Sequence, residues 1–389
     1  MDSDAPSYDV DFYSPQLVAD PHTHYRAIRD LGAAVWLPRN EMWAIGRYDD
    51  ARAALRASDK LISGKGVANN RFMNNERQIA TLVSDGELHR VYRGLVMKPI
   101  MASQAKLLRE RIRSTAETLI DALLQRESFE GMTELAQVIP VSIVSHLVGL
   151  PESGRENMLK WAAATFDTLG SLNELARRAV PSVKESFAYT VNLKREDVAP
   201  DGWAARLFDA ADAGVIEASA VPGLLQDYIA PSLDTAIFAI GHMLDLLGRH
   251  PEQWQAIRAE PKLITPAINE ILRMEAPIRA FTRYVKEDYV VGDRTLPAGS
   301  RAVIMYGSAN RDERHYPEPD RFDIHRKNND HLAFGYGVHH CLGVHLAKVE
   351  MSCLLEVMAE KVQRMDVQPP VLMASNVLRG FQSIKVRLN

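Results

Sequence analysis

Residues 331–348, with the sequence HLAFGYGVHHCLGVHLAK, constrain the fold more than any other stretch of the chain. Glycine allows backbone angles and close approaches that a Cβ would forbid, and three glycines flank Cys341, namely Gly335, Gly337 and Gly343. Beyond the cysteine, apolar residues recur at the spacing of one helix face, namely Leu342, Leu346, Val349 and Leu354. We therefore predict a bent loop that runs into a helix, with Cys341 at the junction.

Cys341 admits three interpretations. Free N–H donors and the positive dipole end of a helix N-terminus would hold it as the thiolate. A lone cysteine is usually a buried structural residue. It could also bind zinc with nearby histidines, namely His339, His340 and His345, but adjacent His339 and His340 point apart and no CxxC or HExxH pattern occurs. The third interpretation is a haem ligand, because a buried thiolate beside a haem-sized cavity binds iron strongly and favours O–O cleavage. Cys353 is expected to be a packed helix residue.

The spacing Phe334-x-x-Gly337-x-His339-x-Cys341-x-Gly343 resembles the haem-binding signature of the cytochrome P450 superfamily. The resemblance implies a mainly α (α+β) fold, with a large helical part and a small β-rich subdomain. It also implies haem b (iron protoporphyrin IX) as the cofactor, with Cys341 as the axial ligand of the iron. Phe334, His339 and Gly343 would contact the same cofactor.

Length and composition limit the number of domains, the class of protein and the compartment that we expect. A chain of 389 residues can bury a large core in one large domain or two small ones, and the resemblance implies one domain over residues 1–389. The net charge of −4 indicates no general nucleic-acid role, and two cysteines fit a reducing compartment. The polar N-terminus looks like neither signal peptide nor anchor, and no apolar run reaches the roughly 20 residues of a membrane span. We therefore expect a soluble, cytoplasmic protein.

Hydrophobic periodicity predicts helices along most of the chain. The expected helices cover residues 21–31, 51–57, 87–99, 103–124, 135–150, 151–169, 173–192, 203–212, 216–249 and 267–275. Strands are expected at about 34–46, 284–297 and 366–388. The polar stretch 64–85 is expected to be a loop, which in a haem protein of this type would roof the substrate pocket.

His89 and Arg93 stand four residues apart and share one helix face. They can be an ordinary surface pair. The resemblance instead implies the H-x-x-x-R helix of the superfamily, whose side chains bind the haem propionates, because buried carboxylates need cationic or N–H partners. Arg283 and His339 match two further propionate partners, and His331 is a weaker candidate.

Residues 216–249 form the longest apolar helical stretch, and Pro231 should kink it because proline removes one backbone hydrogen bond. Asp234 and Thr235 can be an ordinary polar patch. The resemblance implies that they are the catalytic acid–alcohol pair, in which Thr235 contacts bound dioxygen and Asp234 relays protons. Pro231 and Ser232 depart from the small residues that relatives usually have at these positions.

Glu270 and Arg273 stand three residues apart, as in many weak surface ion pairs. Together with Pro319-Asp-Arg321-Phe322 they resemble the E-x-x-R and P-x-R-F motifs of the superfamily. The resemblance implies that Glu270, Arg273 and Arg321 form a buried network that serves folding and haem retention.

Separate redox partners are expected, because no flavin or ferredoxin module follows Asn389. The resemblance implies a ferredoxin and an NAD(P)H-dependent ferredoxin reductase, with dioxygen as the second substrate. Cationic side chains near Cys341 could form the docking surface or could simply be solvated, namely Arg90, Lys98, His340 and Lys348.

Four stretches carry a narrower resemblance, namely Val35-Trp36-Leu37, Phe166 with Asn173-Glu174-Leu175, residues 307–312 and Leu378-Arg379-Gly380. They resemble bacterial O-demethylases of para-substituted benzoates and methoxyaromatics, which implies the substrate class. An apolar pocket for a small ring is expected from Phe166, Leu169, Ile278, Phe281 and Phe381. The benzoate enzymes hold the carboxylate with an Arg-Ser pair, where this chain has Gln226 and Asp227; Ala80 also replaces a serine, although Arg77 remains. An anion beside Asp227 would be repelled.

We therefore hypothesise O-demethylation of a neutral methoxyphenol, guaiacol- or syringol-like, with release of formaldehyde. The phenol hydroxyl would donate to Asp227 or Gln226. Two alternatives stay open: a hydroxylase of a terpenoid, steroid or polyketide, and a non-enzymatic haem–thiolate sensor or carrier.

Overall fold

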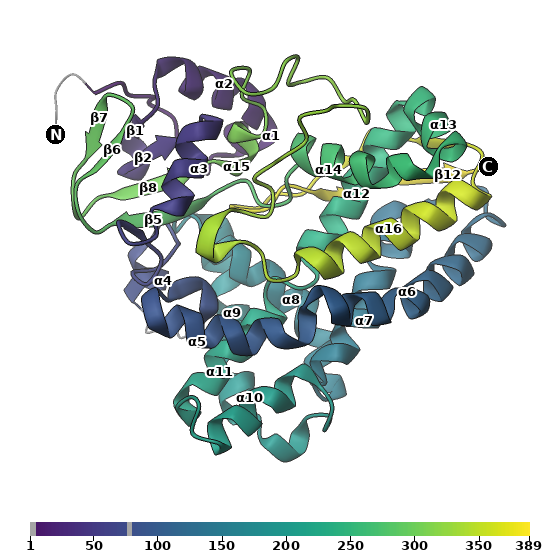
Figure 1. Cartoon of the computed structure of the whole chain (residues 1–389), viewed down its shortest axis with the longest axis horizontal. Coiled ribbons are helices and arrows are strands. Elements are labelled where there is room, and N and C mark those ends of the chain that lie inside the picture. The colour runs from purple at the N-terminus through teal and green to yellow at the C-terminus, as the bar shows by residue number, and fades with distance from the viewer. Residues whose placement is uncertain (1–4, 76–79) are drawn as a thin grey trace.

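The computed structural model describes residues 5–75 and 80–389. Figure 1 shows strands β1, β2, β5 and β8 gathered with helices α2 and α3 at one end, while the longer helices α6 and α16 run side by side at the other. This arrangement confirms the predicted mainly α (α+β) class.

Helices follow one another along most of the chain. The α-helices are α1 Pro15–Ala19, α2 Pro21–Leu31, α3 Tyr48–Arg56, α4 Arg71–Asn75, α5 Gly86–Met97, α6 Ala102–Leu123, α7 Val138–Val148, α8 Glu152–Thr168, α9 Glu174–Asn192, α10 Trp203–Asp212, α11 Val221–Ile229, α12 Asp234–Arg249, α13 Pro251–Ala259, α14 Ile264–Met274, α15 Tyr306–Ala309 and α16 Val344–Lys361. The short helical turns are η1 Pro38–Asn40, η2 Thr81–Val83, η3 Lys98–Ile100, η4 Met132–Ala136, η5 Arg195–Asp197, η6 Ala218–Ala220, η7 Pro261–Leu263 and η8 Gly337–His339. The predicted helices agree within a few residues at most ends, but α4 and η2 fall in the stretch that we expected to be a loop.

The largest sheet has five strands in the order β1-β2-β8-β5-β3. The strands are β1 Val35–Leu37, β2 Met42–Ile45, β3 Leu61–Ile62, β4 Phe129–Glu130, β5 Phe281–Val285, β6 Tyr289–Val291, β7 Arg294–Leu296, β8 Arg301–Ile304, β9 Met365–Val367, β10 Val371–Leu372, β11 Phe381–Ser383 and β12 Lys385–Leu388. The three predicted β regions are found, whereas β3, β4 and β8 were not expected. Strand β8 runs parallel to β2 although about 255 residues separate them. The local sequence pattern does not predict such a long-range pairing.

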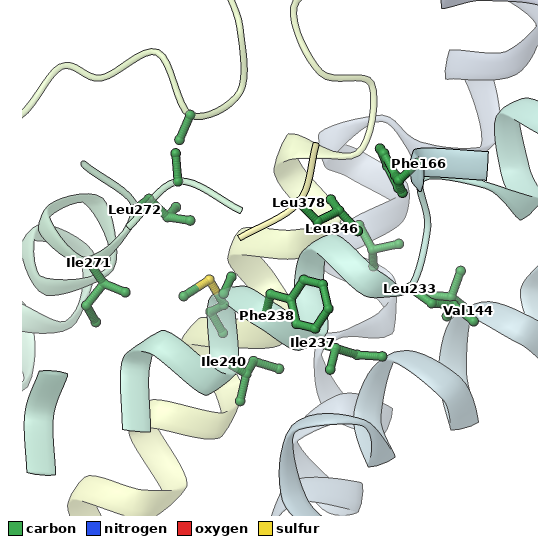
Figure 2. Close-up of a cluster of buried hydrophobic side chains, with 14 of the residues drawn as sticks. Val144, Phe166, Leu233, Ile237, Phe238, Ile240, Ile271, Leu272, Leu346 and Leu378 are labelled. Atoms are coloured by element: carbon green, nitrogen blue, oxygen red, sulfur yellow. The ribbon is translucent and has the colours of Figure 1, made fainter. Parts of the chain in front are cut away.

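Helix α12 is buried nearly all round. Figure 2 shows Ile237, Phe238 and Ile240 of α12 among Leu272 of α14 and Leu346 of α16. A helix that is apolar on every side belongs inside a core rather than at its surface. Helix α12 therefore passes through the centre of the helical part.

The predicted helix 216–249 is wrong in one respect: the chain breaks rather than kinks. Helix α11 ends at Ile229 and α12 begins at Asp234. Pro231 has no N–H to continue the hydrogen-bond ladder. The hydroxyl of Ser232 donates to the carbonyl of Tyr228, and Thr235 Oγ1 donates to the carbonyl of Pro231 at 3.0 Å, so side chains replace the lost backbone bonds.

In the part of the chain that the structure describes, we find no helix with the length and apolar character needed to cross a membrane.

Candidate active site

A cavity of about 290 Å³ lies between the loop that precedes α16 and the break between α11 and α12. Its wall is mainly apolar, with polar groups at a few points. The predicted cofactor and oxygen residues found in this wall are His89, Arg93, Thr235, Arg283, Phe334, His339, Cys341 and Gly343. His331 does not line the cavity.

The cysteine loop is held by its own backbone. The N–H of Cys341 donates to the carbonyl of Phe334 at 2.8 Å. Gly337 has φ +72°, and a Cβ there would lie 2.6 Å from the carbonyl oxygen of Leu55 on α3, so glycine is required. A Cβ on Gly343 would meet only the Cys341 sulfur, at 3.9 Å.

The surroundings of Cys341 differ from the prediction that a helix N-terminus alone holds it as the thiolate. Burial raises the pKa of the Cys341 thiol, while the N–H groups of Gly343 and Val344 and the charge of Arg93 act in the opposite direction. Helix α16 begins only at Val344, so its dipole does not hold the thiolate unaided. The proton is lost when a metal binds, because metals bind the deprotonated form of cysteine.

Four basic side chains line one part of the cavity: His89, Arg93, Arg283 and His339. Arg93 Nη2 donates to the carbonyl of His340 at 2.7 Å, and Arg283 Nη1 donates to the carbonyl of Thr282 at 2.9 Å. His89 has its ring nitrogens 3.0 Å from the carbonyl oxygen of Thr81 and 3.1 Å from that of Val338, so both contact backbone acceptors.

His339 is the unsatisfied member of this group. Its Nε2 is buried with no hydrogen-bond partner among the described residues, and the nearest acid, Asp85, is 4.0 Å away. Burial, together with the charge of Arg283, lowers the pKa of His339 to about 2, so the ring is neutral and can donate a hydrogen bond. A buried anion is the partner that such a donor and its neighbouring arginines would satisfy.

The donor set therefore fits haem b. Cys341 is positioned to supply the thiolate ligand, and Arg93, Arg283 and His339 are placed to receive carboxylates at the same cavity. Across residues 5–75 and 80–389, no three His, Cys, Asp or Glu side chains gather as a metal site. The zinc interpretation thus gains no support from the described part of the chain.

The acid and the alcohol of the predicted pair face different surroundings. Thr235 lines the cavity. The side chain of Asp234 lies outside the cavity wall, is 6% exposed, and its Oδ2 has no partner among the described residues. Burial and the charge of Asp167 raise the pKa of Asp234 to about 7.

The predicted structural network is wrong for Arg321. Arg273 donates to Glu270 at 2.7 and 2.9 Å, and both side chains are buried. The side chain of Arg321 is 61% exposed and pairs with Glu318; only its backbone carbonyl joins the network. Arg326 takes the expected position instead, with Nε 3.1 Å from Glu270 Oε1.

Most of the predicted substrate residues line the cavity, namely Phe166, Leu169, Gln226, Asp227, Ile278 and Phe281. Phe381 does not; its ring packs against His242 at 4.7 Å, because strand β11 directs it toward α12. The Gln226 amide accepts from Ser186 Oγ at 3.0 Å and donates to Thr190 Oγ1 at 3.2 Å, so its groups are already engaged. Arg77 lies outside the described residues.

Sequence reasoning missed Glu350. This α16 residue lines the cavity, is 1% exposed, and has an Oε1 without a partner in the described chain. Burial raises its pKa to about 8. The signal was available, because Glu350 stands four residues from both Leu346 and Leu354, on the buried stripe of the predicted helix.

Cys341, the group of basic side chains and the cavity between them together fit a haem–thiolate protein. Three comparisons agree with this class. The cytochrome P450 family model matches residues 224–371. Cytochrome P450 CYP199A2 of Rhodopseudomonas palustris is 30% identical over 389 aligned residues, which cover 98% of this chain and 94% of the relative.

A protein named mycinamicin IV hydroxylase/epoxidase, from Micromonospora griseorubida, is 29% identical and covers 83% of this chain and 82% of its own length. The solved structure of cytochrome P450 CYP109Q5 from Chondromyces apiculatus is 27% identical, covers 98% of both chains and has a TM-score of 0.82. The chain belongs to the cytochrome P450 family, and its cofactor is haem b. It is a haem-dependent monooxygenase.

Proposed function

We propose that the chain catalyses oxidative O-demethylation of a small neutral methoxyphenol, guaiacol- or syringol-like. The observation that carries the proposal is an ionisable acid, Asp227, which lines the cavity together with apolar side chains, among them Phe166, Leu169 and Phe281. Apolar walls with a few fixed polar groups are typical of small-molecule sites. A ring with one hydroxyl suits this combination.

Asp227 would select the hydroxyl. Its Oδ2 accepts the N–H of Thr81 at 2.8 Å, which fixes the carboxyl in the wall. Burial raises the pKa of Asp227 to about 6, so the group is largely ionised at neutral pH. An ionised carboxyl accepts a phenol hydroxyl and repels a benzoate. Gln226, the other acceptor that we considered, has its amide engaged with Ser186 and Thr190.

Bound haem supplies the activation of dioxygen that inserts one oxygen atom into the methoxy group. The hydroxylated methoxy carbon is a hemiacetal, which collapses to formaldehyde and a phenol. Phe166 and Phe281 would exclude water around the ring. Thr235 would present its hydroxyl to the reacting oxygen, and Asp234, with a pKa of about 7, is suited to exchange a proton near neutral pH.

A spectral titration tests the substrate. Guaiacol and syringol are expected to move the Soret band of the ferric protein to its high-spin position, whereas 4-methoxybenzoate is not. In Asp227→Asn the methoxyphenols should bind roughly tenfold more weakly, the lower end of the cost of losing a charged hydrogen bond, and the benzoate should gain affinity. Asp212→Asn makes the same change at an exposed site and is the matched control. Tight benzoate binding to the unaltered protein would refute the proposal.

Product analysis distinguishes O-demethylation from the second candidate function, which is hydroxylation of a terpenoid, steroid or polyketide. The relative named mycinamicin IV hydroxylase/epoxidase favours this alternative. Equimolar formaldehyde and phenol support demethylation, whereas an alcohol without formaldehyde supports hydroxylation.

An acidic ferredoxin is the proposed electron donor. A groove between α6 and α16, next to the cysteine loop, is lined by basic side chains, namely Lys106, Arg109, His345 and Lys348. Arg90 contributes less than we expected, because it pairs with Glu87, and Arg109 is likewise paired with Glu356. Reduction by a ferredoxin should weaken with added salt and in Lys106→Glu; if neither changes the rate, the ferredoxin docks elsewhere.

A further inference from the structure

Thr81, the first residue of η2, lines the cavity with a side-chain hydroxyl that lacks a partner. The residue is 3% exposed, and its Oγ1 is buried with no hydrogen-bond partner among the described residues. Buried polar groups are normally paired, because an unpaired one costs folding stability. A ligand that fills the cavity would supply the missing partner.

The main chain of Thr81 is held from two sides. On one side its N–H donates to Asp227 Oδ2 of α11 at 2.8 Å. On the other side its carbonyl accepts from Ser84 Oγ at 3.0 Å and lies 3.0 Å from His89 Nδ1 of α5. Threonine is also restricted in its side-chain rotation because it is branched at Cβ. A polar group that is already held in place loses little entropy when a ligand binds to it.

Two further cavity residues have buried polar atoms without a partner in the described chain, namely His339 and Glu350. Of the three, Thr81 is the one that is hydrogen-bonded to Asp227. Its hydroxyl also lowers the pKa of the Asp227 carboxyl, against the larger rise that burial causes. An ionised carboxyl only accepts hydrogen bonds, whereas a hydroxyl also donates one. This part of the wall therefore offers an acceptor and a donor side by side.

We propose that Thr81 is a specificity-determining residue, which donates a hydrogen bond to the oxygen of the substrate hydroxyl while that hydroxyl donates to Asp227. The proposal rests on the proposed methoxyphenol substrate and deepens it. A phenol hydroxyl donates and accepts through one oxygen, so it pairs with both residues. An ether or a ketone only accepts and would leave the Asp227 carboxylate unpaired, and a carboxylate would meet a like charge.

Thr81→Val tests the proposal, because it removes the hydroxyl and keeps the main-chain N–H and carbonyl. In a spectral titration of the haem-bound protein, the Kd of guaiacol should rise about fivefold, which is the typical contribution of one hydrogen bond. Anisole, which is guaiacol without its hydroxyl, should bind no more weakly than to the unaltered protein. Thr81→Ser keeps a hydroxyl and should restore the guaiacol Kd.

Thr165→Val is the matched control. It removes a hydroxyl from the same cavity wall, but that hydroxyl already donates to the carbonyl of Trp161 at 2.8 Å. The ratio of the guaiacol and anisole Kd values should therefore stay near that of the unaltered protein. Unchanged guaiacol binding in Thr81→Val overturns the proposal. An equal loss for anisole overturns it too, because Thr81 would then merely shape the wall.

Asp227→Asn distinguishes the failure of this inference from that of the proposed function. Weaker guaiacol binding in Asp227→Asn with none in Thr81→Val rejects Thr81 and leaves Asp227 as the acceptor. Weaker binding in Thr81→Val alone rejects Asp227 as the acceptor and the substrate argument built on it. In the double variant, the loss should be smaller than the product of the two single losses, because both residues bind one oxygen. Independent losses would show that they bind different groups and would overturn the shared hydroxyl.

Discussion

Replacing Arg326 by alanine should destabilise the protein, whereas replacing Arg321 should hardly matter. The resemblance of the sequence to the superfamily motifs favoured Arg321 as the partner of Glu270. In the structure the carboxylate of Glu270, which is 1% exposed, accepts from Arg273 and from Arg326. The two variants therefore test which arginine stabilises the buried network, Arg321 of the motif or Arg326, which contacts Glu270.

The cost of losing Arg326 follows from what it touches. Glu270 would keep Arg273, so the loss stays near the lower end of the roughly 3–5 kcal/mol for breaking a buried ion pair. One charge-assisted hydrogen bond contributes about 1.5–3 kcal/mol. Arg326 also donates to the carbonyls of Pro317, Glu318 and Arg321, at 2.7, 3.1 and 2.9 Å. We expect a loss of about 3 kcal/mol in all.

The control pair is a surface interaction. The side chains of Arg321 and Glu318 are 61% and 71% exposed, and such pairs contribute at most about 1 kcal/mol. An unfolding entropy of about 2.1 cal/mol/K per residue gives roughly 0.8 kcal/mol/K for this chain length. The Tm should therefore fall by about 4 °C in Arg326→Ala and by about 1 °C in Arg321→Ala.

Thermal unfolding of both variants, compared at equal haem content, measures this difference. Circular dichroism reports the helices, and the Soret band reports haem retention. The reasoning is refuted if Arg321→Ala lowers the Tm as much as Arg326→Ala does, because the exposed side chain would then carry the network.

Two further outcomes follow from the cavity wall and the cysteine loop. Burial raises the pKa of Asp227 to about 6 and that of Glu350 to about 8, both above the unfolded values of roughly 4, so ionisation opposes folding as the pH rises toward and through these values. Between about pH 4 and pH 6, the loss of folding stability should be about 3 kcal/mol smaller in Asp227→Asn than in the unaltered protein. Above pH 8, Glu350→Gln should have a higher Tm than the unaltered protein. Unchanged pH–stability curves would contradict both expectations. Gly337→Ala should lose haem, since its Cβ would meet the Leu55 carbonyl at a φ of +72°, whereas Gly94→Ala, at an exposed position of α5 with no atom within 4 Å of the added Cβ, should retain it; equal haem content would contradict the contrast.

The sequence predicted best where the signal is local. Helix α10 begins and ends at the expected residues, and the hairpin of β1 and β2 lies where alternating apolar residues surround a turn. The cavity residues Cys341, Arg93 and Thr235 were found because each lies in a short motif with fixed spacing. Strand β8 was missed because its partners, β2 and β5, are chosen by the tertiary fold.

The misplaced side chains share one physical cause. Spacing along the chain fixes which residues are near one another, but the loop that carries them decides which side chain turns inward. Arg321 and Arg326 both follow Pro319, and the loop buries the second. A motif therefore specifies the charge that a buried acid needs more firmly than it specifies which neighbouring residue supplies it.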